Sequence, residues 1–417
     1  MDKIISSNIT ARHTLDYLDL SLSKHGWKKN VCDSCSETFY SMVNTTNCGS
    51  DACTKPYSYI RDENHNTSIS SVELNEKLKM LFAGYGYEKT KPRHILHTKS
   101  KPNVKILEES LFTIAGVQIL DSLLFDEQSP VTSEQRLFVS QPSVRLNFIQ
   151  KVGTEYGLYS SFVNVCTLST DATPESFVNE IQLWGEVLGN VLGLNLLSIK
   201  ISEKISNWAG KQSPVVKVLF SNRGLELGDG CFHYSFPQTS RPNLQMTDIG
   251  FGLERLTCAI NGTNRHFDVM GPYLNSIMGD WISMDRLRTL VLLVGSNVLP
   301  SESHYGTKVR GLIKDLDEAD NSSSKWINIL PYYYSFWSNF TTLELTPMKI
   351  RDLIRDEIFR STNIKLANIL RLSISQEQIK LPPFEFVENL IKGSNKEKLS
   401  IAKVENALTN LHRNDKH

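Results

Sequence analysis

The chain has 417 residues, with 45 acidic and 45 basic side chains and therefore no formal net charge when histidine is neutral. A chain of this length can form about two or three domains with sizeable cores. The balanced charge gives no chain-wide attraction to nucleic acid or to a membrane surface. No run approaches the ~20 apolar residues of a spanning helix, and the first residues lack the apolar segment of a secretory signal. We therefore expect a cytoplasmic protein without a membrane partner.

The N-terminal region combines an amphipathic helix, expected within residues 10–27, with four closely spaced cysteines. Cys32 and Cys35 form a C-x2-C pair, and Cys48 and Cys53 follow after a short spacer. Two such pairs can each supply half of a tetrahedral zinc site with four sulfur ligands. The alternative is a set of reduced thiols without metal, because disulfides are rare in a reducing cytosol. The spacing favours zinc.

The central part of the chain alternates helical and extended patterns. Leucines on one face predict a helix over residues 73–82, and a longer amphipathic helix is expected over residues 174–194. Residues 139–152 are expected to be extended, so that Arg145 and Asn147 lie on the same side. A strand over residues 214–220 is expected to pair with the next segment through a hairpin near Gly228, Asp229 and Gly230.

Residues 247–262, TDIGFGLERLTCAING, combine a Gly-x-Gly turn with the start of a helix. Gly250 and Gly252 let the backbone approach a ligand closely. Arg255 falls in the first helical turn, where the helix dipole and free N–H groups favour an anion such as a phosphate. The alternative is a strand–turn–helix corner whose Glu254 and Arg255 are solvated. The Asn-Gly dipeptide that follows predicts the end of the helix.

The string D-x-G-x-G-L-E-R-L, followed by N-G and F-D, closely resembles motif 3 of alanyl-tRNA synthetases, which are class II synthetases. The cysteine segment followed by P-Y-S-Y-I resembles the archaeal branch of that family. Further similarities are Q-P-x-x-R-L-N with V-G, and D-x-L-R-x-L, V-L-P-S and G-x-x-x-R-x-L-I within residues 281–316. The resemblance extends from about residue 27 to about residue 372.

This resemblance implies an α+β fold, with a class II synthetase-like antiparallel sheet flanked by helices and followed by a helical domain. It divides the chain into a zinc-knuckle segment (residues 1–65), a catalytic domain (66–275) and a helical domain similar to a tRNA-recognition region (276–417). Helical periodicity over residues 350–372 agrees with the last of these. We expect no segment corresponding to an editing domain in this chain.

The resemblance also implies an activity: ATP and a small, alanine-like amino acid form an aminoacyl adenylate, and the acyl group passes to tRNA or another acceptor. The implied cofactors are ATP, Mg²⁺ and Zn²⁺. Asp248 would hold the substrate ammonium group, and Arg255 the nucleotide. The remaining expected catalytic or substrate-binding residues are Arg145, Asn147, Phe162, His233, Gly250, Gly252 and Glu254. For His233, the residues alone favour a strand histidine that faces solvent or contacts a backbone carbonyl.

The sequence departs from the family pattern at four positions. In motif 2, Gly157 replaces the expected arginine and Val163 the expected glutamate, so Arg145 or Lys151 would have to supply the cation at the α-phosphate. Lys217 replaces an acidic residue, and Glu302 replaces an asparagine that reads the tRNA acceptor stem. A second hypothesis follows from these changes: a repurposed synthetase paralog that binds an amino acid or a partner, or acts in biosynthesis, without standard adenylation.

Overall fold

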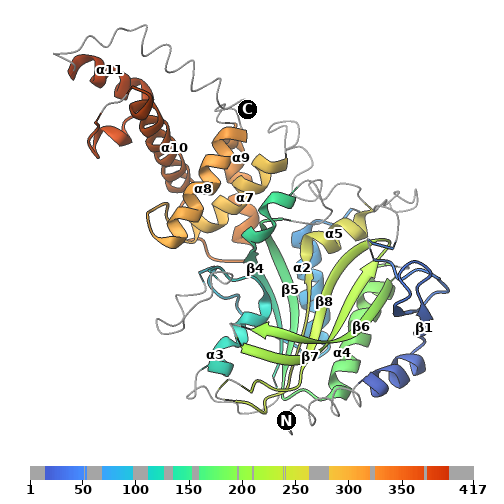
Figure 1. The fold of residues 1–417 in the computed structure, drawn as a ribbon. Helices are drawn as coiled ribbons and strands as arrows, with labels where there is room; N and C mark the ends of the chain where they lie inside the picture. The colour runs from blue at the N-terminus through green and yellow to red at the C-terminus, as the bar shows by residue number, and fades with distance from the viewer. Residues whose placement is uncertain are drawn as a thin grey trace. The chain divides into compact units, whose positions relative to one another are not determined.

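The computed structural model describes residues 15–50, 52–53, 68–96, 111–125, 135–152, 159–194, 197–208, 211–237, 239, 241–262, 281–319, 325–370 and 373–393. Two compact units make up the chain: Met1–Tyr273 with Asn339–Thr341, and Leu274–Ser338 with Thr342–His417. The first unit contains the sheet, and the second is helical (Figure 1). Several predicted features lie outside the described residues, namely the P-Y-S-Y-I segment (56–60), Gly157 and the F-D pair (267–268).

Among the described residues, nine strands form one sheet in the order β1-β2-β6-β7-β8-β9-β5-β4-β3. Every neighbouring pair is antiparallel except β3 and β4. The strands are β1 (Lys28–Val31), β2 (Thr38–Ser41), β3 (Glu88–Lys89), β4 (Arg136–Val144), β5 (Ser161–Thr170), β6 (Leu197–Trp208), β7 (Lys211–Asn222), β8 (Leu225–His233) and β9 (Met246–Gly252). The predicted α+β class, with an antiparallel sheet flanked by helices and followed by a helical region, is confirmed. The three-domain division stays a prediction.

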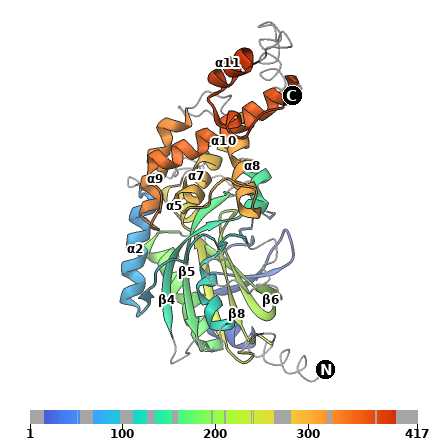
Figure 2. The same ribbon diagram turned by 90° about the vertical axis from the view of Figure 1, so that its left-hand side faces the viewer.

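One face of the sheet is covered by α2 (Ser71–Gly84), α4 (Pro174–Glu186) and α5 (Leu253–Asn261). Figure 2 shows α2 along this side. The fully buried Trp184 packs against Phe82 of α2 and Phe251 of β9, with ring centroids 4.4 and 4.3 Å apart. Its indole N–H donates to Thr167 Oγ1 at 2.8 Å. The predicted helix over residues 73–82 is confirmed within α2, which begins at a capping box formed by Ser70 and Glu73.

Part of the opposite face is covered by a short 3-10 helix, η3 (Gly116–Leu120), and by α3 (Asp121–Phe125). Their leucines pack on side chains of β4, β5 and β9 and form a second apolar core. The buried members of this core are Leu120, Leu123, Leu124, Val139, Cys166, Leu168, Phe236, Leu244 and Met246. The rest of this face is left for polar side chains.

Three sequence predictions were wrong in detail. The extended segment stops at Val144, and η4 (Leu146–Lys151) follows as a 3-10 helix, so Arg145 and Asn147 do not share one side of a strand. The β7–β8 turn lies at Arg223 and Gly224, which both have positive φ (48° and 86°), whereas residues 228–230 lie inside β8. The helix predicted over residues 174–194 is α4, which ends at Glu186 and is followed by a π-helical turn, η5 (Val187–Val191).

The second unit contains α7 (Trp281–Gly295), α8 (His304–Ala319), α9 (Trp326–Ser338), α10 (Pro347–Leu370), the 3-10 turn η7 (Gln378–Lys380) and α11 (Pro383–Gly393). The buried Arg288 of α7 lies over the Trp337 ring of α9 at 4.5 Å, and the Trp337 indole N–H donates to the Arg288 carbonyl. Helix α10 confirms the helical prediction over most of residues 350–372. Within the described part of the chain, no helix has both the length and the apolar character that crossing a membrane requires.

Candidate functional site

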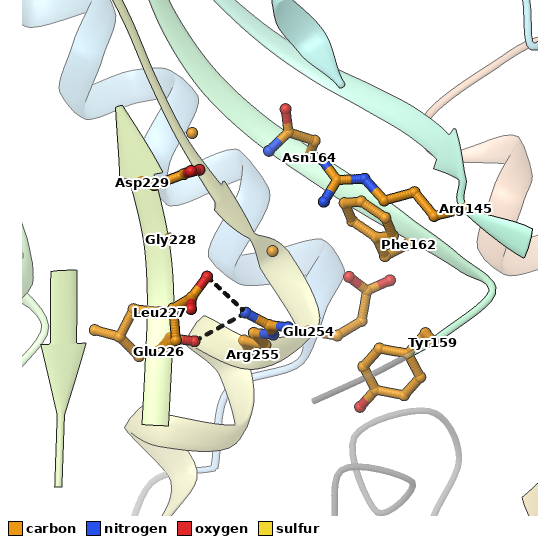
Figure 3. A pocket seen from close by; sticks show the side chains of 12 residues that line it. Arg145, Tyr159, Phe162, Asn164, Glu226, Leu227, Gly228, Asp229, Glu254 and Arg255 are labelled. Carbon is orange, nitrogen blue, oxygen red and sulfur yellow. Dashed lines mark hydrogen bonds and ion pairs between the residues drawn. The ribbon is translucent and has the colours of Figure 1, made fainter. Parts of the chain in front are cut away.

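A cavity of about 220 Å³ opens on the face of the sheet opposite α2 and α4, over β5, β8, β9 and the start of α5 (Figure 3). Four residues predicted from the motifs as nucleotide or substrate contacts, Gly250, Gly252, Glu254 and Arg255, line it together with Arg145 and Phe162. The other lining residues were not predicted as site residues: Tyr159, Asn164, Glu226, Leu227, Gly228 and Asp229.

Glycines keep the backbone at the floor of the cavity accessible. A Cβ atom on Gly250 would lie 2.9 Å from the Asn164 side-chain nitrogen. Asn164 itself is fixed, because its Oδ1 accepts the Gly116 N–H at 2.7 Å and its Nδ2 donates to the Phe251 carbonyl at 3.2 Å. Gly228 lies across from β9, where a Cβ would come within 2.2 Å of the Gly250 carbonyl oxygen. Glycine is therefore required at both positions, because neighbouring atoms of the sheet leave no room for a Cβ atom.

Arg255 occupies the first turn of α5, as predicted. Its Nη1 donates to the Glu226 carbonyl at 3.1 Å and lies 3.7 Å from the Glu226 carboxylate. The predicted C-terminal stop is also confirmed, because Gly262 adopts a left-handed conformation with φ of 59°. The helix start and the guanidinium group together make this end of the cavity attractive to an anion.

Arg145 enters the same cavity from the end of β4. Its Nε donates to the Ile114 carbonyl at 2.9 Å, and its guanidinium lies 5.0 Å from the centre of the Phe162 ring. Burial lowers the pKa of Arg145; Asp229 and Glu226 act in the opposite direction, and the positive charge of Arg255 lowers this pKa further. Two guanidinium groups thus repel each other across the cavity, and a bound anion would relieve that repulsion.

Glu254 connects the motif 3 helix to β5. It is 1% exposed, and both carboxylate oxygens accept the Val163 backbone N–H, at 3.2 and 3.1 Å. The Val163 side chain is fully buried and points to the helix-covered face, whereas its neighbours Phe162 and Asn164 line the cavity. The position at which the family pattern has a glutamate therefore contributes no side chain to the cavity in this alignment. Asn164 occupies the next cavity-facing position of β5.

Asp248 lies on β9 two residues before Gly250, and it is not among the residues that line the cavity. Its Oδ1 is 3.0 Å from His233 Nε2, and the His233 Nδ1 lies 3.0 Å from Ser213 Oγ. His233 is 3% exposed and stacks on Phe236 at 5.2 Å. The interpretation of His233 as a solvent-facing or carbonyl-bonded histidine was therefore wrong, because strand pairing brings the Asp248 carboxylate beside it.

Cys231 is directly opposite Asp248 in the β8–β9 ladder and two residues before His233. Burial, followed by the negative charges of Asp248 and Asp229, raises the pKa of the Cys231 thiol well above its ordinary value. Ligand atoms of Cys231, His233 and Asp248 all lie within 4.8 Å of one another. Lys217, the residue that departs from the family's acidic position, lies opposite Cys231 on β7 and forms an ion pair with Asp229.

Several predicted positions lie elsewhere. Asn147 is exposed in η4 and does not line the cavity, and Lys151 at the end of that turn is also exposed. Glu302 is exposed in the second unit, just before α8. Hydrogen bonding to Glu357, with a smaller contribution from the charge of Glu302, raises the pKa of Arg360.

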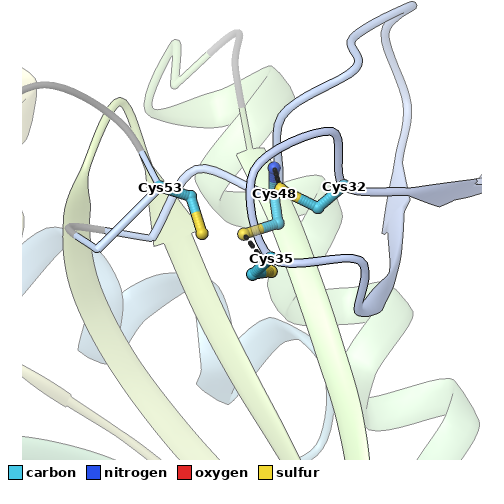
Figure 4. Close-up of side chains that lie close together, drawn as sticks. All are labelled: Cys32, Cys35, Cys48 and Cys53. Atoms are coloured by element: carbon cyan, nitrogen blue, oxygen red, sulfur yellow. Dashed lines mark hydrogen bonds between the residues drawn. The ribbon is translucent and has the colours of Figure 1, made fainter.

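The four N-terminal cysteines converge on one point beside β2, as Figure 4 shows. Their sulfur atoms all lie within 4.8 Å of one another, and those of Cys35 and Cys48 are 4.0 Å apart. Sulfur atoms around a tetrahedral zinc ion with Zn–S of 2.3 Å are about 3.8 Å apart. Burial raises the pKa of Cys32, but backbone hydrogen bonds from Cys48, Cys35 and Ser34 bring it to about 6. The donor set and spacing therefore fit a metal ion with four sulfur ligands.

The chain is similar to archaeal alanine–tRNA ligases. It is 26% identical to that of Methanothermobacter thermautotrophicus over 265 residues, which are 62% of this chain and 28% of the relative. The ligase of Korarchaeum cryptofilum is 26% identical over 314 residues, or 73% of this chain and 32% of the relative. The chain thus resembles archaeal alanine–tRNA ligases over 62% to 73% of its own length. It spans about a third or less of the length of these relatives.

Two solved pyrrolysyl-tRNA synthetase structures from Desulfitobacterium hafniense are also similar to this chain. They match with TM-scores of 0.34 and 0.33, at 13% and 15% sequence identity, over 51% and 48% of this chain. The matched parts are 76% and 69% of those chains. No protein-family model matches the sequence.

Proposed function

We propose that the protein activates a small, alanine-like amino acid with ATP, forming an aminoacyl adenylate and pyrophosphate. The observation that carries this proposal is the convergence of Arg145 and Arg255 on one cavity floored by Gly250 and Gly252. The sequence similarity to alanine–tRNA ligases supports the same chemistry. Adenylation needs the substrate carboxylate and the α-phosphate of ATP to be held together while negative charge develops, and two fixed cations suit that task.

Arg145 is the proposed cation at the α-phosphate. Its Nε is occupied by the Ile114 carbonyl, so the side chain is held in place before substrate binds. The Phe162 ring lies beneath the guanidinium and offers an apolar face on which a purine base can stack. This arrangement supplies a charge that the motif 2 sequence, with Gly157 and Val163, does not provide.

Glu226 and Asp229 are the proposed positions for Mg²⁺, because their carboxylates line the cavity beside the two arginines. Magnesium prefers oxygen ligands and commonly binds through one or two carboxylates together with substrate phosphates. When bound, it would neutralise phosphate charge. Asp248, two residues before Gly250 on β9, and its neighbour His233 are proposed to form the site of the substrate amino group.

The acceptor of the acyl group is proposed to be tRNA or another nucleophile. An exposed carboxylate at Glu302, where a tRNA-reading asparagine would be expected, repels phosphate and favours a different acceptor. The same departure supports the second candidate, a paralog that binds an amino acid without adenylating it. Pyrophosphate exchange separates the two, because it reports adenylation without requiring any acceptor.

The experiment is amino-acid-dependent exchange of labelled pyrophosphate into ATP by the purified chain, screened across the standard amino acids. We expect exchange with alanine or a similarly small amino acid. Arg145→Ala should reduce it by about 10²–10³-fold, as for removal of one group that stabilises transition-state charge. The matched control is Arg136→Ala, an exposed arginine at the far end of β4, which should exchange as the unaltered protein does. Absence of exchange with every amino acid would support the non-adenylating paralog.

We also propose that Cys32, Cys35, Cys48 and Cys53 hold one structural zinc ion. A closed site with four sulfur ligands stabilises a small loop-rich segment that buries few apolar side chains. Metal analysis should show that Cys35→Ser contains one zinc equivalent less per chain than the unaltered protein, while Cys258→Ala, a buried cysteine of α5, keeps it all. Full zinc retention by Cys35→Ser contradicts the assignment.

A further inference from the structure

The group formed by Cys231, His233 and Asp248, here called the floor triad, lies on the open face of the sheet beside the cavity. Cys231 and His233 are two residues apart on β8, so both side chains point to the same face. Asp248 is directly opposite Cys231 on β9. Sulfur, imidazole nitrogen and carboxylate oxygen thus reach one point, within 4.8 Å of one another. Rigid central strands, rather than a loop, fix all three.

Hydrogen bonding around His233 sets which ring nitrogen carries a proton. Ser213 Oγ donates its only proton to the Ser235 carbonyl at 2.8 Å. In its contact with Ser213 at 3.0 Å, His233 Nδ1 is therefore the donor. A neutral imidazole then presents the lone pair of Nε2 to the Asp248 carboxylate, 3.0 Å away. The Nε2 lone pair and the carboxylate oxygen then converge on one point, as two ligands of one metal ion do.

The third member of the triad favours a metal. A thiol contributes little to a histidine–carboxylate proton bridge, but it is a strong zinc ligand. Around a tetrahedral zinc ion, nitrogen and oxygen ligands lie about 3.3 Å apart, close to the contact between His233 and Asp248. The Nδ1–H donated to Ser213 is also the outer hydrogen bond that orients metal-binding histidines.

Exposure shows where a fourth ligand would enter. The His233 side chain is 4% exposed, whereas that of Asp248 is 20% exposed. Gly250, which lines the cavity, is two residues beyond Asp248 on the same strand, or roughly 7 Å along it. The triad is thus closed around His233 and more exposed at Asp248, which is the end nearer to Gly250 along the strands. Three protein ligands with one open position are the pattern of a zinc site that binds substrate.

We propose that the floor triad binds a second zinc ion, distinct from that of the N-terminal cysteines, and that its open position takes the α-amino nitrogen of the amino-acid substrate. Zinc binding releases the Cys231 thiol proton to solvent, and the substrate ammonium group likewise loses one proton when its nitrogen becomes a ligand. The zinc site stands on the triad geometry alone; the amino-nitrogen ligand rests on the proposed adenylation.

Zinc content tests the site without ATP or any substrate. The unaltered protein should contain about two zinc equivalents, one for each set of ligands. Cys231→Ser and Asp248→Asn should each retain about one, and a Cys35→Ser/Cys231→Ser double variant almost none. Cys258→Ala is the matched control and should retain two. Retention of two equivalents by both single variants, with native circular dichroism, overturns the site, as does a single equivalent in the unaltered protein.

Cobalt substitution tests the amino-nitrogen ligand directly. In a Cys35→Ser background, Co²⁺ at the triad should give about a quarter of the thiolate charge-transfer absorption of a four-sulfur site, because it has one thiolate ligand. Each standard amino acid is then added, and the visible d–d bands should shift for the substrate and disappear with Asp248→Asn. Cobalt binding with no shift for any amino acid overturns the substrate ligand while leaving the metal site. Pyrophosphate exchange, measured separately, shows whether adenylation itself has failed.

Discussion

On β9, Thr247 and Asp248 are adjacent, yet they belong to opposite faces of the sheet with different chemistry. Thr247 faces α4 and donates its hydroxyl to the buried Glu180 at 2.6 Å, within a layer that also contains Trp184 and Phe251. Asp248 faces the open side, beside His233 and the glycines of the cavity. On β5, Val163 and Phe162 divide in the same way.

The two faces of the sheet are stabilised by different interactions. The helix-covered face is held by close packing, where a lost contact costs stability. The open face carries glycines and two arginines, and burial together with the charge of Arg255 lowers the pKa of Arg145, an arrangement that suits a bound anion. Val163, which replaces the expected motif 2 glutamate, faces the covered side.

The largest expected effect lies on the covered face. Trp184→Ala removes a fully buried ring that contacts Phe82 and Phe251, and it leaves Thr167 without its indole donor. The free energy of unfolding should fall by about 3–5 kcal/mol in urea denaturation. Trp281→Ala, at a partly exposed tryptophan of α7, is the control and should change it by far less. Equal losses of unfolding free energy in Trp184→Ala and Trp281→Ala would contradict the conclusion that close packing stabilises the covered face.

Two glycines sharpen the comparison at the cavity floor. A Cβ on Gly228 would meet the Gly250 carbonyl oxygen at 2.2 Å, so β8 and β9 must separate. We expect Gly228→Ala to destabilise the protein by about 1–3 kcal/mol. A Cβ on Gly252 meets only the Arg255 side chain, at 3.6 Å, and its φ of −72° suits alanine. Gly252→Ala should therefore be neutral or slightly stabilising. Thermal melts should show a lower melting temperature for Gly228→Ala and an unchanged or slightly higher one for Gly252→Ala.

The smallest effect concerns pH. Burial, together with the charge of Asp248 on the other face, raises the pKa of Glu180 above the ordinary value of 4.5. The folded protein then binds more protons than the unfolded chain between those two pKa values, so this group lowers stability as pH rises from about 4.5 to its folded pKa. Glu180→Gln should flatten that decline in unfolding free energy measured across the range. An unchanged pH profile would show that folding does not raise the pKa of Glu180.

Local signals predicted the strand–helix corner well. The two glycines, the apolar spacing of α5 and the Asn-Gly stop act within a few residues, so β9, α5 and the placement of Arg255 follow from sequence. Asp229 and Asn164 were missed because their role depends on which strands are neighbours, and Asn164 on β5 pairs with Gly252 on β9, 88 residues later. The contact between Asp248 and His233 likewise arises because β8 and β9 are neighbouring strands.

Turn chemistry accounts for the other misses. Gly228 and Gly230 look like turn residues, but they sit within β8 because β9 approaches closely, and the turn uses Arg223 and Gly224 instead. For Asn147, periodicity could not show that the chain leaves the sheet at Arg145 and enters a 3-10 turn. The resemblance to synthetases indicated Arg145 and Asn147 as site residues, but it did not show that the backbone changes from strand to 3-10 helix between them.

The central claim, that the open face is a nucleotide site built around two arginines, is tested most directly by calorimetric titration with MgATP. The unaltered protein should bind MgATP at one site. Arg255→Ala should raise the dissociation constant for MgATP by about ten- to a hundred-fold, the value of one charged hydrogen bond. Its melting temperature should equal that of the unaltered protein. Arg136→Ala should bind MgATP as the unaltered protein does. Absence of MgATP binding by the unaltered protein, or equal affinity in Arg255→Ala, would contradict the account.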